Sequence, residues 1–344
     1  MTLHARPWLD SVAPYVPGRR APSPDGSMAS NESPVPTSQR VVEAIAAAAA
    51  SATRYPDPLA DALRAELADQ HRVHPDQILV GNGSDELIFL LAIAYLAHGG
   101  RAICADPAYQ VDQISARIVN ADVSGVPLRD WAHDLEAMAQ LPATIAYVVN
   151  PHNPTGTVRS RADLQRFVRA ARADLVVIDE AYIDFTDDPA ARTALPLARA
   201  GQAVVLRTFS KIDGLAGLRV GYLVGDRDIV ATLRKIRAPF SVGSVAQAAA
   251  LAAARDHAHR ARVRSHAIAH RADLTCLLRQ AGYEVIPSQA NFVCVITPDE
   301  AGLLDRLAAH GIVARPGSAL GLPGSVRISV PSSRGLALLA AALG

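Results

Sequence analysis

The chain has 344 residues, half of them hydrophobic, and a formal net charge of +1. This length suits a large domain with a smaller one, and the near-neutral charge gives no reason to expect a nucleic-acid partner. The three cysteines, odd in number and without a CxxC pair, argue against a disulfide framework or a metal site and fit a reducing cytoplasm. Residues 1–20 lack the apolar core of a signal peptide, and the longest apolar run, 87–97, is too short to span a bilayer. We therefore expect a cytoplasmic protein without a membrane partner.

The first 40 residues are rich in proline, serine and glycine. This composition favours an extended arm that crosses another surface, although a disordered tail would have a similar composition. A helix is expected from about 36 to 52, and the prolines of 54–58 then end it. Leucines at four-residue spacing predict a second helix that ends near residue 71.

Short apolar strands alternate with helices from residue 77 onward. The expected strands are 78–80, 102–104, 144–149, 175–178 and 203–206. Nearly continuous apolar runs are typical of strands whose two faces are both covered by helices, so we expect a mostly parallel, doubly wound α/β sheet. Each strand ends in a polar cluster, and ligands bind beyond the carboxyl ends of such strands. The sequence therefore predicts one binding site at this edge.

Beyond residue 239 the pattern changes to that of an α+β unit. One long helix is expected over 244–281, followed by strands and helices at 283–286, 291–296, 299–310, 312–315, 326–330 and from 333 onward. We predict an N-terminal arm and start of a small domain at 1–50, a large ligand-binding domain at 51–245 and a C-terminal small domain at 246–344.

Lys211 stands out because the chain has only one other lysine, Lys235, and its remaining basic residues are arginine. An ammonium can lose its proton and become a nucleophile, which a guanidinium in a protein cannot do. Covalent chemistry at Lys211, most simply a Schiff base, is one interpretation. The other is a surface lysine that lies in this loop by chance.

The strand-end clusters each have a functional and a structural interpretation. Gly83–Asp85 opens a helix and could bind an anion or simply cap that helix. Asp179 follows a buried strand and needs a cation, either a protonated ring nitrogen or an arginine. Arg219 suits a phosphate or a surface carboxylate, and Tyr109 suits a ligand ring or the core. Taken together with Lys211, these groups are what pyridoxal phosphate requires.

The motifs that carry a family resemblance run through nearly the whole chain. They read ARPWL, VAPYVPG, SNESP, YPDP, GNGSDE, PAY, NPHNPTG, DEAYIDF, TFSK, GLAGLRVGY, SQANF and VRISV. This set resembles fold-type I aminotransferases of class I and II, and within them the histidinol-phosphate aminotransferases. The resemblance implies a large domain with a mostly parallel, doubly wound seven-stranded sheet, a smaller α+β domain, pyridoxal 5'-phosphate as cofactor and a homodimer with shared active sites.

The resemblance also implies roles for the matching positions. Lys211 would attach the cofactor covalently, Asp179 would pair with its ring nitrogen, and Tyr109 would stack on the ring. Asn153 and Tyr182 would contact the ring hydroxyl. The phosphate would be bound by Gly83, Ser84, Thr208, Ser210 and Arg219, with Tyr55 of a partner subunit, and Asp85 is a further expected cofactor-binding residue.

For the substrate, the resemblance implies that Arg327 grips the carboxylate of the amino donor with Arg315 as its helper, and that Tyr15 and Asn31 also bind substrate. A bidentate arginine suits a carboxylate or a phosphate, although Arg327 in a strand could equally pair with a core carboxylate. Three departures from the family pattern are expected near the substrate side chain. They are His152, the pair Ile212–Asp213, and Ser241–Ser244.

The expected reaction is transamination between glutamate and a keto compound, with histidinol phosphate and imidazole acetol phosphate as the leading pair. The alternatives are an aromatic or specialised-pathway amino acid, a pyridoxal-phosphate-dependent lyase or cyclase, and a protein that binds the cofactor without turnover. The histidines and arginines between 257 and 270 are interpreted as a solvated helix face rather than a metal or nucleic-acid site. Cys104 and Cys294 are expected in the core.

Overall fold

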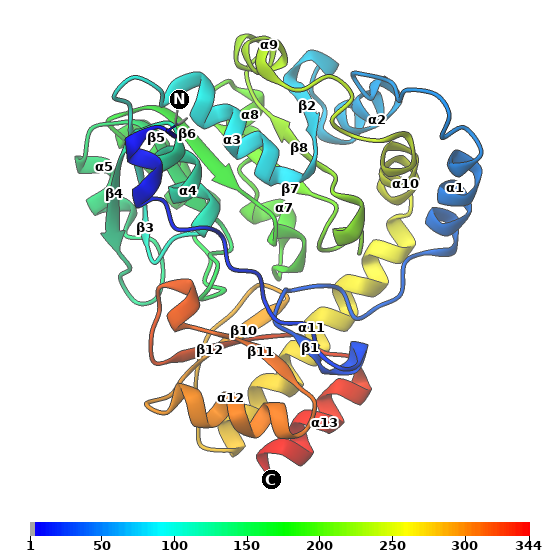
Figure 1. Cartoon of the computed structure of the whole chain (residues 1–344), viewed down its shortest axis with the longest axis vertical. Helices are drawn as coiled ribbons and strands as arrows, with labels where there is room; N and C mark the ends of the chain where they lie inside the picture. The colour runs from blue at the N-terminus through cyan, green and yellow to red at the C-terminus, as the bar shows by residue number, and fades with distance from the viewer. Residues whose placement is uncertain (1–3) are drawn as a thin grey trace.

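The computed structural model describes residues 4–344 and contains two units, a large α/β unit and a smaller α+β unit (Figure 1). The large unit is built on a seven-stranded sheet with the order β2-β8-β7-β6-β5-β3-β4. Its strands are β2 (Ile78–Gly81), β3 (Arg101–Asp106), β4 (Asp122–Pro127), β5 (Ala143–Val149), β6 (Ala173–Asp179), β7 (Val204–Thr208) and β8 (Gly221–Val224). From β7 to β4 all pairs are parallel, and β8 alone runs antiparallel to both neighbours. The expected mostly parallel sheet is confirmed.

Helices cover both faces of this sheet. Along β2, Ile78 and Val80 enter one hydrophobic cluster while Leu79 enters the opposite one, as the alternation of side chains along a strand requires. The first cluster is closed by α1 (Gln39–Ala49), α2 (Asp61–His71), α5 (Leu135–Gln140), α6 (Arg161–Ala170), α8 (Leu195–Arg199) and α10 (Ser244–Ala254). The second is closed by α3 (Gly83–Tyr95), α4 (Gln110–Ile118) and α9 (Arg227–Ile236). The sheet is therefore doubly wound.

The smaller unit has a five-stranded sheet with the order β1-β11-β12-β10-β9. These strands are β1 (Ser27–Met28), β9 (Glu284–Ile286), β10 (Phe292–Ile296), β11 (Val313–Pro316) and β12 (Ser325–Ser329), and they pack with α12 (Glu300–Ala309) and α13 (Ser333–Leu343). β1 comes from the N-terminal segment and pairs in parallel with β11, and Met28 is fully buried in the core of the small unit.

The single long helix expected over 244–281 is wrong, because two helices occupy this stretch. α10 ends at Ala254 and α11 (His257–Gln280) begins after Asp256. The Asp256 carboxylate accepts a hydrogen bond from the backbone N–H of His259 at 3.0 Å. This N-cap satisfies a free donor of α11 and starts a new helix direction. α11 then runs from the large unit into the small one (Figure 1).

The N-terminal segment lies against its own chain in the part that is described, while residues 1–3 of the expected arm fall outside it. Trp8 Nε1 donates to the carbonyl of Ile118 at 3.1 Å, and Arg315 Nη2 donates to the carbonyl of Val16 at 2.5 Å. β1 belongs to the small sheet, whereas α1 packs against α10 on the large unit. The domain bounds at 50 and 245 stay a prediction.

Candidate active site

A cavity of about 230 Å³ lies where the large sheet, the N-terminal segment and the small unit meet. Most of the residues predicted from sequence line it. They are Tyr15, Asn31, Ser84, Asp85, Tyr109, Asn153, Asp179, Tyr182, Thr208, Ser210, Lys211, Arg219, Arg315 and Arg327. Sequence reasoning missed Ser30, Glu32 and Gln110, which also line the cavity. The acidic residue of the SNESP motif was the one signal that could have indicated Glu32.

Lys211 extends its amine into this cavity. Its Nζ donates to the carbonyl of Ser30 at 3.1 Å, and it lies 5.7 Å from the centre of the Tyr182 ring. Burial, together with the positive charge of Arg327, lowers the pKa of Lys211 to about 8. A substantial fraction of the amine is therefore neutral and nucleophilic in weakly basic solution.

Asp179 is the last residue of β6 and is almost fully buried. Its Oδ1 accepts a hydrogen bond from the backbone N–H of Ala181 at 2.8 Å, and no ion pair within residues 4–344 involves it. Burial raises its pKa to about 7. A buried carboxylate in this position favours a cation that the described chain does not supply.

An anion cradle forms between the start of α3 and the loop after β7. Arg219 donates from Nη1 to Ser210 Oγ at 3.3 Å and from Nη2 to Asp85 Oδ2 at 3.1 Å. Gly83 has a φ of +74°, and a Cβ added there would lie 2.5 Å from Arg219 Nη2. Only glycine permits this approach. The free N–H groups of the first turn of α3, with Ser84 and Arg219, make a site for a phosphate-like anion.

The aromatic residues of the cavity are held by polar neighbours. Tyr109 donates its hydroxyl to Asp85 Oδ1 at 2.8 Å, and the Tyr182 hydroxyl accepts from Asn31 Nδ2 at 3.1 Å. Burial raises the pKa of both phenols. Both side chains are therefore neutral and are fixed against the cavity, where a flat ligand ring would contact them.

Arg327 is a buried guanidinium without a carboxylate partner in the described chain. Its Nη1 donates to Asn153 Oδ1 at 2.6 Å and its Nη2 to the carbonyl of Ala29 at 2.6 Å, while Nε has no hydrogen-bond partner. Burial lowers its pKa. The alternative that Arg327 pairs with a core carboxylate is therefore wrong, and an anionic ligand is the partner that it lacks.

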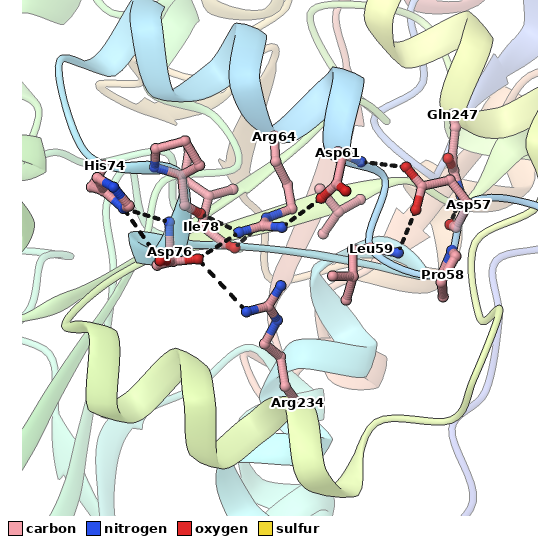
Figure 2. A network of polar contacts seen from close by, with 12 residues as sticks. Asp57, Pro58, Leu59, Asp61, Arg64, His74, Asp76, Ile78, Arg234 and Gln247 are labelled. Carbon is pink, nitrogen blue, oxygen red and sulfur yellow. Dashed lines mark hydrogen bonds and ion pairs between the residues drawn. The ribbon is translucent and has the colours of Figure 1, made fainter.

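Tyr55 lies away from the cavity and is 83% exposed. It stacks on Phe240, with ring centroids 4.7 Å apart. Figure 2 shows the polar network that fixes the following segment. Asp57 accepts from the backbone N–H groups of Leu59 and Asp61 at 2.9 and 2.7 Å, and its carbonyl accepts from Gln247 Nε2 at 2.8 Å. The Tyr55 ring therefore lies outside this cavity, stacked on Phe240 beside a fixed segment.

The three departures from the family pattern do not line the cavity themselves, and their expected place near the substrate side chain stays a prediction. His152 is fully buried, with Nδ1 2.9 Å from Thr155 Oγ1 and Nε2 3.1 Å from the carbonyl of Pro107. Ile212–Asp213 packs toward α11. Ser241, in the third departure, donates to Glu86 Oε2 at 3.1 Å. His152 and Ile212–Asp213 supply internal contacts, whereas Gly243 and Ser244 line a surface hollow beside Tyr55.

Other features of the described chain carry little chemistry. Within residues 4–344, no group of three or more His, Cys, Asp or Glu side chains is arranged to hold a metal. No helix in the same range is long and apolar enough to cross a membrane. Cys104 and Cys294 are buried in the core as expected, and Cys276 is exposed.

The cavity therefore unites an amine with a lowered pKa, a buried carboxylate without a cation, an anion cradle and a fixed tyrosine. These groups fit the aldehyde, the ring nitrogen, the phosphate and the ring face of pyridoxal phosphate. The site and the mostly parallel sheet together define a fold-type I enzyme that acts on amino groups.

Comparison with known proteins agrees with this class. The model of the family "Aminotransferase class I and II" matches residues 27–343, and the chain belongs to that family. A histidinol-phosphate aminotransferase 2 of Pseudomonas aeruginosa is 37% identical over 342 residues, covering 95% of this chain and 93% of the relative. A histidinol-phosphate aminotransferase of Brevibacillus brevis is 37% identical over 309 residues, covering 88% of this chain and 85% of the relative.

Solved structures give the same result for the fold. A histidinol-phosphate aminotransferase of Sinorhizobium meliloti in complex with pyridoxal 5'-phosphate matches with a TM-score of 0.90 and 27% identity, over 100% of this chain and 97% of the other. An aspartate aminotransferase of Thermus thermophilus, 21% identical, matches with a TM-score of 0.85. The predictions of fold class, family and aminotransferase chemistry are confirmed, and the predicted cofactor is the one bound in the Sinorhizobium protein.

We predict that Gly221→Ala weakens both the fold and the anion cradle. The added Cβ would lie 2.5 Å from the backbone nitrogen of Ser84 and 2.7 Å from the carbonyl carbon of Gly83. Backbone atoms cannot move aside cheaply, so the free energy of unfolding should fall by at least about 2 kcal/mol. Gly217→Ala is the matched control, because its Cβ meets nothing within 4 Å. Equal denaturation midpoints and equal cofactor retention for the two variants would contradict the prediction.

We predict that Asp179→Asn stabilises the cofactor-free protein in basic solution while weakening retention of the cofactor. The folded-state pKa of Asp179 is raised to about 7, so stability from its protonated form is present in acid and is lost as pH rises through 7. The asparagine variant should be more stable by roughly 2–4 kcal/mol near pH 8 and by less than about 1 kcal/mol near pH 4. Urea titrations at both pH values measure this, and a lower stability of the variant near pH 8 would sink the idea.

Proposed function

We propose that this aminotransferase uses pyridoxal phosphate to move an amino group between glutamate and a keto compound, with histidinol phosphate and imidazole acetol phosphate as the substrate pair. The observation that carries the proposal is the buried Arg327 guanidinium, which has no carboxylate partner and shares one cavity with Lys211 and Asp179. The relatives in Pseudomonas and Brevibacillus carry the name of this activity.

The bound cofactor supplies an electron-accepting ring that makes bonds at the amino-bearing carbon of a substrate easier to break. Asp179 keeps the ring nitrogen protonated, because only a cation there relieves the cost of its buried charge. Lys211 would hold the aldehyde end of the cofactor, and its free amine would take and return the proton at the reacting carbon. Asn153 and Tyr182 hold the ring hydroxyl, and the cradle at Ser84 and Arg219 holds the phosphate.

Arg327 and Arg315 bind the anionic end of each substrate. Both side chains are buried beside the cavity, and their open N–H groups suit a carboxylate or a phosphate equally. Glutamate would present a carboxylate and histidinol phosphate a phosphate to the same arginines. Tyr15 and Asn31, on the N-terminal segment, complete the wall at this end. One site could therefore accept two amino donors whose other ends have only a negative charge in common.

A homodimer would explain why the ring of Tyr55 is exposed outside the cavity of its own chain. Its ring is exposed on a rigid segment together with Phe240, which is 39% exposed. Two stacked aromatic side chains on an open surface are typical of a protein interface. In the proposed dimer, Tyr55 reaches the phosphate bound by the partner subunit. The cytoplasmic location stays a prediction.

Transfer to an aromatic or specialised-pathway keto acid is the second candidate, since Arg327 would grip the carboxylate of any such acid. A lyase or cyclase on the same scaffold is the third. The shape of the pocket decides which of these substrates the site selects, and half-reactions with each amino compound measure that selectivity.

The test is the half-reaction of the cofactor-loaded protein with single amino donors. Glutamate and histidinol phosphate should each convert the cofactor to its amine form, with loss of visible absorbance, and histidinol phosphate should act at least about tenfold faster than phenylalanine. Release of carbon dioxide would favour the lyase. An unchanged spectrum with glutamate would exclude this donor. Borohydride reduction should fix the cofactor on Lys211, and an adduct on Lys235 would overturn the site.

We predict that Tyr55→Phe lowers cofactor affinity about tenfold through loss of one hydrogen bond to a charged group. Mixed dimers decide whether Tyr55 acts across the interface. A dimer of a Lys211→Ala chain with a Tyr55→Phe chain should keep one full-affinity site. A dimer of a wild-type chain with a chain that carries both changes should keep none. The reverse pattern in cofactor titrations would place Tyr55 in its own subunit's site.

A further inference from the structure

The turn that carries Lys211 is docked on α11 by two residues that do not face the cavity. Gly214 N–H donates to the carbonyl of Lys211 at 3.1 Å and closes the turn. Ile212 and Asp213 follow the lysine directly, and both are at most 3% exposed although they lie in a loop. Loops normally lie on the surface. Burial of both an apolar and a charged side chain in this turn indicates a specific docking contact.

One face of α11 receives the turn. Ile212 packs in one hydrophobic cluster with Val263 and Ala267, and Arg260 precedes them by three and seven positions, on the same helix face. Arg260 Nε lies 3.6 Å from Asp213 Oδ1. The helix that receives the turn is the one that joins the large unit to the small unit (Figure 1). We define Ile212, Asp213, Arg260, Val263 and Ala267 as the lysine-turn dock.

The ion pair of the dock continues into a partly buried row of alternating charges. Arg260 Nη2 lies 3.2 Å from Asp184, Asp184 lies 3.7 Å from Arg207, and Arg207 pairs with Glu180 at 2.7 Å. Glu180 follows Asp179 in the chain. The row therefore links α11 to the strand end that faces the cofactor as well as to the lysine turn.

Removal of Asp213 leaves every other charge of this row with an ion-pair partner. Arg260 keeps its partner Asp184 without it, whereas Asp213 has only Arg260, and its Oδ1 has no hydrogen bond. Burial raises the pKa of Asp213 to about 6, opposed by the charge of Arg260. A buried carboxylate held by one distant cation adds little net stability. The contact between Asp213 and Arg260 instead fixes where the turn that carries Lys211 lies on α11.

We propose that Asp213 is a positioning residue, which acts through Arg260 to fix the turn against α11 and so sets where the Lys211 amine lies in the cavity. The same helix supports the small unit, which carries Arg327. The positions of Lys211 and Arg327 in the cavity therefore both depend on α11. The catalytic use of Lys211 rests on the proposed function, but the position of its amine does not.

The test measures the amine itself in the full-length, cofactor-free chain. Because the chain has only two lysines, trace acetylation with acetic anhydride across about pH 6–11, read by peptide mass spectrometry, gives separate titration curves for Lys211 and Lys235. Asp213→Asn should loosen the turn, admit water around Nζ and raise the Lys211 midpoint by about one pH unit toward its ordinary value. The charges that face this amine are unchanged. They are Arg327, Asp85, Glu32, Arg219 and Asp179.

Glu66→Gln is the matched control, since it removes a carboxylate that pairs with Arg255 at 2.6 Å beside the start of α11 but does not touch the turn. It should leave both lysine curves unchanged, as Asp213→Asn should leave that of Lys235. Arg260→Gln should shift Lys211 in the same direction, and the double variant should shift it no further, because both act through one contact. An unchanged Lys211 curve in Asp213→Asn, additive shifts, or loss of the fold by circular dichroism in Asp213→Asn would overturn the proposal. A borohydride adduct on Lys235 would defeat the proposed function alone.

Discussion

Two buried charges of opposite sign share the central cavity without neutralising each other. Asp179 ends a central strand of the large sheet, and Arg327 lies on β12 of the small sheet. Each lacks an ion pair among residues 4–344. Burying such charges costs several kcal/mol each unless a partner arrives. The two sheets keep the charges on separate walls, so a protonated ring nitrogen would lower the free energy of Asp179 and the anionic end of a substrate would lower that of Arg327.

This electrostatic arrangement explains why the rest of the site is held so firmly. Gly221 allows a close approach of the backbone that a side chain would block, and Gly83 leaves room for the Arg219 guanidinium. The Asp57 network fixes the segment that follows Tyr55 (Figure 2). A site that relaxed would let water or a neighbouring side chain compensate the unpaired charges. Rigidity preserves the cavity's affinity for its ligands.

Sequence predicted the parallel sheet and most of the cavity wall, because polar clusters at strand ends converge by topology alone. It did not predict the break at Asp256, where a helix cap interrupts an alanine-rich pattern that favours one continuous helix. It also missed α4, β4, α5, β8 and α9, which are short, although α4 and α9 are amphipathic and β8 is an apolar run. The departures at His152 and Asp213 were expected near substrate, because chain order cannot tell which side of a loop faces the ligand. Their burial is a tertiary property.

The order in which the two units are completed follows from β1. Met28 is fully buried among residues of α11, α12 and α13, and Ser27 pairs with Val313. During synthesis, this N-terminal pair of residues leaves the ribosome nearly the whole chain length before its partners do. The large sheet can close as soon as β8 emerges, whereas the small unit must wait for its last helix. During synthesis, completion of the small unit should therefore follow that of the large one, and with it the assembly of the arginine wall of the site.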